Sequence, residues 1–207
     1  MKHLFGNLKM RWLTVILFSV VAGIYTGLVM LVPFLDDTSF QDIGISYEWW
    51  VIFAVLIVVN CKKNWEAALK CFVFFLISQP LVFLTEILLG PMTWEMGLYY
   101  LRNWLPIMIL TLPGGFIAWY CKKQNTLGAV VLGLGNTIQA FLGVSYLSKA
   151  ITDFPHHLLS SLVCFVSIFV MSFFIQKEKK QRWISILLPL ILVAVLLVLL
   201  KLTGRTL

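Results

Sequence analysis

The chain has 207 residues, of which 60% are hydrophobic and 12% charged, and its formal net charge is +7. Soluble domains are about 45–50% apolar and about 25% charged, and a soluble fold of this size lacks the interior to bury so much apolar surface. The composition therefore excludes a soluble domain and predicts an all-α, polytopic transmembrane helical bundle. The basic residues lie in short turns between apolar runs, so we attribute them to membrane orientation and not to nucleic acid.

Seven apolar segments follow one another along the chain. They predict helices over residues 12–35, 43–60, 66–90, 103–120, 126–147, 157–175 and 183–200, within a single integral membrane domain spanning 1–207. The first run is longer than the apolar core of a signal peptide and no small-residue cleavage site follows it, so we expect it to be retained. The strictly apolar part of the second segment, Trp49–Val59, is short, and we expect this helix to lie deeper on one side of the membrane or to be partly covered. Trp49 and Trp50 mark its outer end as an aromatic belt.

The sequence TWEMGLYYLRN follows the third segment. With Tyr100 and the adjacent Trp104, it is expected to form a loop that lies in the outer interface.

The distribution of charge predicts the orientation of the bundle. Eleven of the sixteen lysines and arginines precede the first segment or lie in the turns after the second, fourth and sixth: Lys2, Lys9, Arg11, Lys62, Lys63, Lys122, Lys123, Lys177, Lys179, Lys180 and Arg182. Six acidic residues fall in the opposite loops: Asp36, Asp37, Asp42, Glu48, Glu95 and Asp153. The positive-inside rule then predicts a cytoplasmic N-terminus and an outer C-terminus, in a cell membrane such as the bacterial plasma membrane.

Two of the basic turns have similar sequences, CKKNWEAA from Cys61 and CKKQNTLGA from Cys121. A third basic turn follows at a similar interval, so three hairpins after a leading helix are a plausible plan. Either duplication or convergence on short basic turns explains this pattern. No cysteine falls in a predicted outer loop, which argues against a disulfide framework.

Small residues mark two predicted packing faces. Gly23 and Gly27 form a G-x-x-x-G motif in the first segment, and such glycines let a neighbouring backbone approach closely. In the fifth segment, Gly135, Gln139 and Gly143 recur every four residues and so share a helix face.

The fourth segment contains a possible hinge. Pro113, Gly114 and Gly115 are consecutive in the middle of the apolar run. Proline removes one backbone hydrogen bond, so we expect this sequence to weaken the helix in mid-membrane.

The third segment carries the most polar side chains of any apolar run. Ser78, Gln79 and Pro80 lie at its centre and Glu86 near its outer end. A charged side chain at the bilayer centre costs about 2.5–3.5 kcal/mol. Pro80 removes a backbone hydrogen bond, so we expect it to act as a hinge or packing residue. Gln79 and Glu86 are seven residues apart and therefore share a face. We expect them to line a polar cavity. The alternative is that Glu86 reaches the outer headgroups and Gln79 makes one interhelical hydrogen bond. Lys70, near the inner end, is expected to snorkel to the interface.

The predicted cavity lies between the third, fourth and fifth segments. Asn136 and Gln139 of the fifth segment are at a depth comparable with that of Gln79 and could complete its lining with Ser78 and Glu86. Small residues together with amides are typical of helix–helix interfaces in lipid, so the same face also fits packing alone.

Other polar clusters give no sign of catalysis. Asp153, His156 and His157 could bind a metal or sense pH, but adjacent histidines point in different directions, and we interpret them as the interfacial start of the sixth segment. The chain lacks paired intramembrane aspartates, an H-E-x-x-H motif and a phosphate-binding loop. We predict no catalytic residue, no metal ligand and no cofactor.

Two hypotheses of function remain. The first is a solute-binding or transport subunit; the size, the helix count and the Gly23–Gly27 motif are similar to those of the membrane-embedded substrate-binding subunits of energy-coupling-factor importers. That family's first-helix motif uses alanines near the cytoplasmic side, whereas these glycines lie in mid-helix. The second is a non-catalytic membrane partner, an immunity, assembly or regulatory subunit. The expected partners are the lipid bilayer and either a small solute, another membrane subunit or a second copy of the chain.

Overall fold

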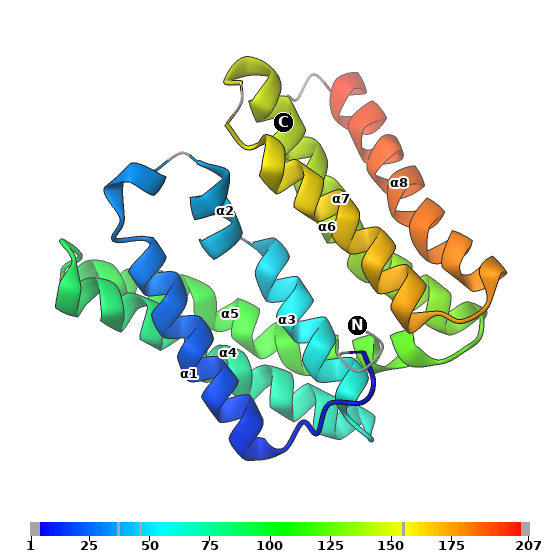
Figure 1. Cartoon of the computed structure of the whole chain (residues 1–207), viewed down its shortest axis with the longest axis horizontal. Helices are drawn as coiled ribbons and strands as arrows, with labels where there is room; N and C mark the ends of the chain where they lie inside the picture. The colour runs from blue at the N-terminus through cyan, green and yellow to red at the C-terminus, as the bar shows by residue number, and fades with distance from the viewer. Residues whose placement is uncertain (1–4, 37, 46, 155, 204–207) are drawn as a thin grey trace. The chain divides into compact units, whose positions relative to one another are not determined.

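A computed structural model of the chain describes residues 5–36, 38–45, 47–154 and 156–203, and of residues 43–45, 47 and 48 it describes the backbone. Within these ranges all regular structure is helical (Figure 1), which confirms the predicted all-α class. The helices are α1 (Trp12–Val29), η1 (Pro33–Leu35), α2 (Ser39–Ile45), α3 (Tyr47–Asn60), α4 (Asn64–Leu89), α5 (Trp94–Ala118), η2 (Trp119–Lys122), α6 (Thr126–Thr152), α7 (Leu158–Ile175) and α8 (Lys179–Leu202).

Six of the described helices are long and apolar enough to cross a membrane, namely α1, α4, α5, α6, α7 and α8. The second predicted segment differs from the other six. It is divided into the short α2 and the 14-residue α3, whose apolar part, Trp49–Asn60, is shorter than the six long helices, as its sequence indicates. At 1.5 Å per residue, α3 is about 21 Å long, against about 30 Å for a hydrocarbon core.

The largest error in the predicted boundaries concerns α5. Residues 94–102 were expected to form a loop in the outer interface, but they are the first turns of α5, which begins where the Thr93 hydroxyl accepts a hydrogen bond from the Met96 amide at 3.3 Å. The helix then continues through Pro106 and through Pro113 to Ala118. The aromatic composition of these residues suggested an interfacial loop, whereas Thr93 is an ordinary N-cap residue that begins a helix.

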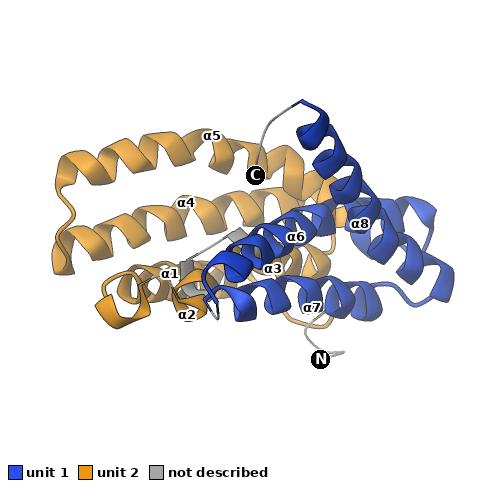
Figure 2. Cartoon of the chain, turned by 90° about the horizontal axis from the view of Figure 1, so that it is seen from above, with its two compact units in different colours: residues 1, 120–207 blue, residues 2–119 orange. Residues whose placement is uncertain are grey.

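The chain forms two compact units (Figure 2). Unit 2 contains α1 to α5 and ends at Trp119, and unit 1 contains α6 to α8 and begins at Tyr120. The core of unit 2 is aromatic: the rings of Phe18 and Phe53 are 4.9 Å apart, and those of Trp50 and Phe74 are 5.8 Å apart. Ala140, Ile168, Ile186 and Val193 form the aliphatic core of unit 1.

Hydrogen bonds bring three separate segments of unit 2 to one end. The Asn60 side-chain oxygen accepts from the amides of Gly6 and Leu8, at 3.0 and 2.7 Å. The Trp119 indole donates to the Cys61 carbonyl at 3.1 Å. The start of α1, the turn after α3 and the end of α5 therefore share one end of the unit, so α3 returns the chain to its starting end despite its length.

Unit 1 is joined in the same way at the start of α6 and the end of α7. Gln176 donates to the Cys121 carbonyl at 2.6 Å, and Gln124 donates to the Ile175 carbonyl at 2.8 Å. Lys122 and Lys123 thus share one end of the unit with Lys177, an arrangement that the predicted inner turns require.

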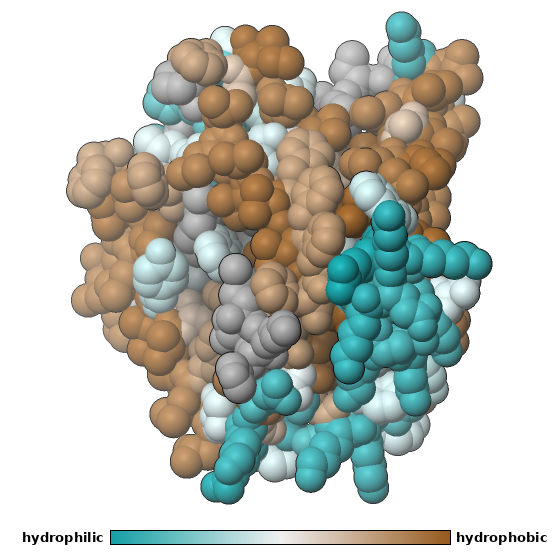
Figure 3. All heavy atoms as spheres, turned by 45° about the vertical axis from the view of Figure 1, so that its right-hand side comes forward, coloured by the Kyte–Doolittle hydropathy of each residue, from teal (hydrophilic) through white to brown (hydrophobic). Residues whose placement is uncertain are grey.

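The outer faces of the helices are apolar. In Figure 3, hydrophobic side chains cover most of the visible surface, and hydrophilic ones gather toward its lower part. Large exposed side chains on the long helices include Leu13, Leu98, Leu110, Ile191 and Val198. Such a surface is unfavourable in water and suits contact with a lipid bilayer.

Candidate functional site

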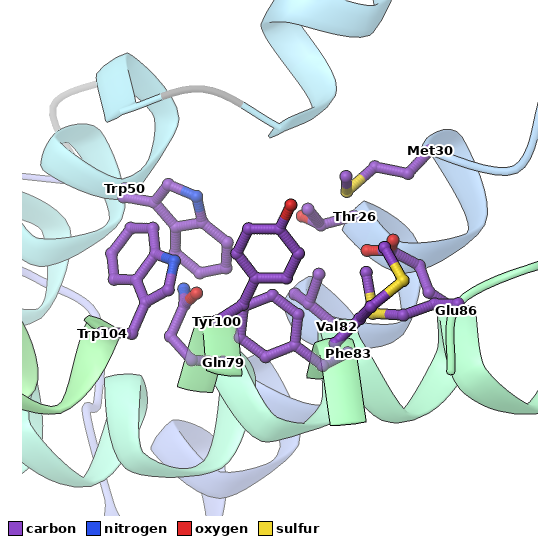
Figure 4. Close-up of a pocket in the computed structure, with 11 residues that line it drawn as sticks. Thr26, Met30, Trp50, Gln79, Val82, Phe83, Glu86, Tyr100 and Trp104 are labelled. Carbon is purple, nitrogen blue, oxygen red and sulfur yellow. The ribbon is translucent and has the colours of Figure 1, made fainter. Parts of the chain in front are cut away.

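A cavity of about 440 Å³ lies within unit 2 (Figure 4). Its lining comes from α1, α3, α4, α5 and the turn between the last two: Thr26, Met30, Trp50, Gln79, Val82, Phe83, Glu86, Met92, Met96, Tyr100 and Trp104. Small-molecule sites are typically about 300–1,000 Å³ and mostly apolar with a few polar groups. The volume and composition of this cavity are of that kind.

Helix α4 supplies the polar side of the cavity. Gln79, Val82, Phe83 and Glu86 are spaced three, four and seven residues from the first, and these intervals place side chains on one helical face. The shared face expected for Gln79 and Glu86 is thus the face that the cavity occupies.

Both polar side chains are buried and incompletely paired. Gln79 is 2% exposed and Glu86 is 6% exposed. Neither the Gln79 amide nitrogen Nε2 nor the Glu86 oxygen Oε1 has a hydrogen-bond partner among the described residues. Leaving a buried polar group without a partner costs about 1–3 kcal/mol, and more for a charged group. The Gln79 side chain can therefore donate a hydrogen bond to a molecule in the cavity, and the Glu86 side chain can accept one.

The two ends of the cavity differ chemically. In Figure 4, Trp50 and Trp104 lie on the side of Gln79, and Met30 lies on the side of Glu86. Tyr100 stacks on Phe83 with ring centroids 6.1 Å apart and an interplanar angle of 15°. Met92 and Met96 add two further thioethers. Because Tyr100 and Met96 are exposed on their other sides, they form the rim of the cavity.

Close packing of α1 on α4 holds this wall in place. A Cβ atom built on Gly23 would stand 2.6 Å from the Ser78 carbonyl oxygen, and one on Gly27 would stand 2.6 Å from the Cβ of Thr85. Since real Cβ atoms do not approach so closely, only glycine allows this contact. The G-x-x-x-G motif thus brings Thr26 and Met30 of α1 to the cavity.

Ser78 lies beneath this contact and is not among the residues that line this cavity. Its side chain is fully buried, and its hydroxyl oxygen has no partner among the described residues. Its predicted place in the cavity wall stays a prediction. Pro80 lies within α4, which is continuous through it, and its predicted role as a hinge also remains open.

Lys70 is held by partners at the end of unit 2 where α4 begins, and its snorkelling to the interface stays a prediction. It is 3% exposed, and its ammonium donates to the Glu66 carboxylate and to the Met10 carbonyl. Glu66 also accepts from the Lys62 amide at 2.9 Å. A nearby carboxylate and carbonyl satisfy the ammonium inside unit 2, so it need not reach the headgroups.

Asn136 and Gln139 lie in unit 1 and are not among the residues that line the cavity. The Asn136 amide donates to the Ser172 hydroxyl at 3.2 Å and to the Ser185 carbonyl at 3.1 Å. These bonds join α6 to α7 and α8, so Asn136 acts as an interhelical contact. Gln139 is fully buried, and its predicted contribution to the solute site stays a prediction.

The other predicted packing residues have different surroundings. Gly143 lies against Cys164 and Phe165 of α7, and Gly115 lies against Ala67 and Ala68 of α4. Each lets two helices approach closely within its own unit.

Three positions are different. A Cβ on Gly114 or on Gly135 would meet no atom within 4 Å, and Pro113 is exposed. Helix α5 is continuous through Pro113–Gly115, so the hinge expected there stays a prediction. A packing role for Gly135 also stays a prediction.

Asp153 and His157 of the aspartate and histidine cluster lie at helix ends, Asp153 as the C-cap of α6 and His157 as the N-cap of α7. His157 is the N-cap of α7 with a left-handed φ of 64°, and its ring stacks on Tyr146 with centroids 5.9 Å apart. Among the residues described, no group of three or more histidine, cysteine, aspartate or glutamate side chains could hold a metal ion.

Sequence reasoning missed most of the cavity wall. Trp50, Tyr100 and Trp104 were assigned to interfacial aromatic belts, and the methionines were not singled out. One signal was present: Met96, Tyr100 and Trp104 recur every four residues and so form one face of a helix. It was overlooked because residues 94–102 were predicted to be a loop.

The chain matches no protein-family model, no curated protein sequence and no solved structure.

Proposed function

We propose that this membrane protein binds a small solute in the cavity of unit 2, as a solute-binding or transport subunit. The observation that carries the proposal is the pair Gln79 and Glu86, two buried polar side chains that face one cavity and each leave an atom unpaired. A solute that supplies an acceptor to Gln79 and a donor to Glu86 would remove this unfavourable free energy.

The packing residues support solute binding over the alternative of a non-catalytic partner. That alternative rests on small-residue faces free to receive another helix. In the structure, α4 covers Gly23 and Gly27, and α7 covers Gly143. These three glycines are therefore used within the chain, whereas a Cβ on Gly135 would meet no atom within 4 Å.

The test is to measure which small molecules the protein retains. Wild type and Gln79→Leu are purified in lipid nanodiscs and the bound solutes are identified by mass spectrometry. We expect wild type to retain a solute that Gln79→Leu has lost. Ser78→Ala is the matched control, because it removes the neighbouring buried polar group outside the cavity lining.

Two outcomes would contradict the proposal. Equal retention by wild type and Gln79→Leu would mean that the cavity does not hold the solute. Recovery of a stoichiometric partner chain, with no retained solute, would favour the partner function.

A further inference from the structure

We infer that the solute is an arylalkylamine cation, with its ammonium beside Glu86 and its aromatic ring among Trp50, Tyr100 and Trp104. This inference rests on the proposed function, because it assigns the chemical class of the solute that this cavity holds. Three features carry it: the charge of the lining, the division of the cavity into two ends and the spacing of its two unpaired atoms.

The charge of the lining is complementary to a cation. Glu86 is its one carboxylate, and the lining residues include no lysine, arginine or histidine. The nearest lysine on the same helix is Lys70, sixteen residues or about 24 Å away along the axis, and its ammonium is engaged by Glu66. A buried carboxylate without a counter-charge is strongly unfavourable. An ammonium would neutralise Glu86, whereas a carboxylate solute would be repelled.

The methionines of the lining suit an ammonium with an apolar substituent. Met30 lies on the side of Glu86 in Figure 4, and Met92 and Met96 also line the cavity; all three are uncharged and polarisable, and they adapt to irregular shapes. Such walls favour the alkyl part of an amine. Because the methionine side chains carry no charge, Glu86 is the lining residue that can pair with the charge of the amine.

The opposite end of the cavity suits a flat ring. Trp50 and Trp104 lie there in Figure 4, and Tyr100 is held against Phe83 by stacking. Aromatic pairs in offset or edge-to-face contact are favourable beyond the burial of their area. The Gln79 amide nitrogen lies at this end with an unused donor. An acceptor atom on the ring would receive its hydrogen bond.

The spacing of the two polar groups sets the length of the solute. Seven residues of α-helix rise about 10 Å between the backbone positions of Gln79 and Glu86, so the ammonium and the ring acceptor should lie at opposite ends of a molecule no longer than about that. Tyramine has this form, with an ammonium, a two-carbon linker, a ring and a phenolic oxygen. It is therefore the probe with which we state the test.

The test compares three probes that differ in charge and share a hydroxyphenyl ring. Equilibrium dialysis measures the binding of tyramine, of the neutral alcohol tyrosol and of the anion 3-(4-hydroxyphenyl)propanoate to the full chain in phosphatidylcholine nanodiscs. We expect tyramine to bind at least about tenfold more tightly than tyrosol, because an ionic hydrogen bond replaces a neutral one. The propanoate should bind most weakly.

A substitution tests whether Glu86 produces this order. Glu86→Gln should weaken tyramine binding about tenfold and tyrosol binding much less, since the amide keeps the size and loses the charge that pairs with the ammonium. Glu95→Gln is the control, because Glu95 is an exposed carboxyl at the start of α5 that does not line the cavity. If the Glu86→Gln variant fails to fold, the order of the three binding affinities in wild type still tests the inference.

The results separate this inference from the proposed function. Tyrosol or the propanoate binding as tightly as tyramine would overturn the cation assignment. Failure of tyramine to bind at millimolar concentration, while wild type still retains a solute that Gln79→Leu loses, would overturn the solute class and leave the proposed function standing. If tyramine does not bind and wild type retains no solute that Gln79→Leu loses, both the cation assignment and the proposed function are overturned.

Discussion

Gly23 of α1 lies directly on the backbone of α4 at Ser78. A Cβ atom added to Gly23 would stand 2.6 Å from the Ser78 carbonyl oxygen and 3.1 Å from its Cα. Backbone atoms cannot move aside as a flexible side chain can, so the two helices would have to separate. The contact lies beside Gln79, and it sets the distance between α1 and the polar face of the cavity.

Gly23→Ala should therefore destabilise the protein by about 1–3 kcal/mol, the usual effect of overpacking a close contact. Gly114→Ala is the matched control, since a Cβ there meets no atom within 4 Å and alanine favours a helix by about 0.5–1 kcal/mol over glycine. Unfolding in detergent, followed by circular dichroism, measures both variants. Equal stability of the two would show that α1 does not pack closely at this point.

Asn136→Leu should destabilise unit 1 by about 1–2 kcal/mol, because it removes the hydrogen bonds from α6 to Ser172 and Ser185. The control is Thr137→Val, which removes only a bond to the Gly133 carbonyl in the same helix, at 3.0 Å. Thermal unfolding in nanodiscs compares them. A larger effect for Thr137→Val would argue against the interhelical role of Asn136.

Lys70→Met should leave the Glu66 carboxylate and the Met10 carbonyl without their shared donor. Because Glu66 is 32% exposed, water compensates in part, and we expect a loss of about 1–3 kcal/mol. Lys62→Met removes an exposed lysine and should change stability by less than about 0.5 kcal/mol. Denaturation in a titration with sodium dodecyl sulfate checks both. An unchanged midpoint for Lys70→Met would mean that this lysine is not held inside unit 2.

Gln79→Cys should react with a membrane-impermeant thiol reagent applied from outside the cell, if the predicted orientation holds. The native background should be low, because Cys61, Cys71, Cys121 and Cys164 are buried and, unlike Gln79, are not among the residues that line the cavity. Ser78→Cys is the control: it is adjacent, but it lies under α1 and outside the cavity lining. Gel-shift detection of the modified thiol measures both. Reaction only from the cytoplasmic side would reverse the predicted orientation, and equal reaction of the two variants would contradict the cavity.

Local patterns in the sequence identified the class of protein and part of the site. Apolar runs of spanning length predict membrane helices, because a backbone in lipid must satisfy its own hydrogen bonds. A seven-residue interval puts Gln79 and Glu86 on one face whatever surrounds α4. The G-x-x-x-G motif predicts a close contact for α1 in the same way. These conclusions depend on spacing along one helix, which the sequence contains completely.

The predicted helix boundaries were less accurate where amino-acid composition suggested a loop and an N-cap residue began a helix. The aromatic residues of 94–102 suggested an interfacial loop, yet one N-cap at Thr93 begins a helix that continues through two prolines. The partners of Lys70 were not predicted for a related reason: its ammonium donates to the Met10 carbonyl, sixty residues away in the chain. Neither a cap nor a distant acceptor is visible in hydropathy.

By itself, the sequence determined that this is an all-α membrane protein and which face of α4 is polar. Only the tertiary structure decided what stands opposite that face. Trp50 is nearly thirty residues before Gln79 and Trp104 twenty-five after it, and both line one cavity, whereas Asn136 is bonded to α7 and α8. Helical periodicity is a local property that residue types encode directly, while the partner of a helix face is set by the packing of segments distant in the chain.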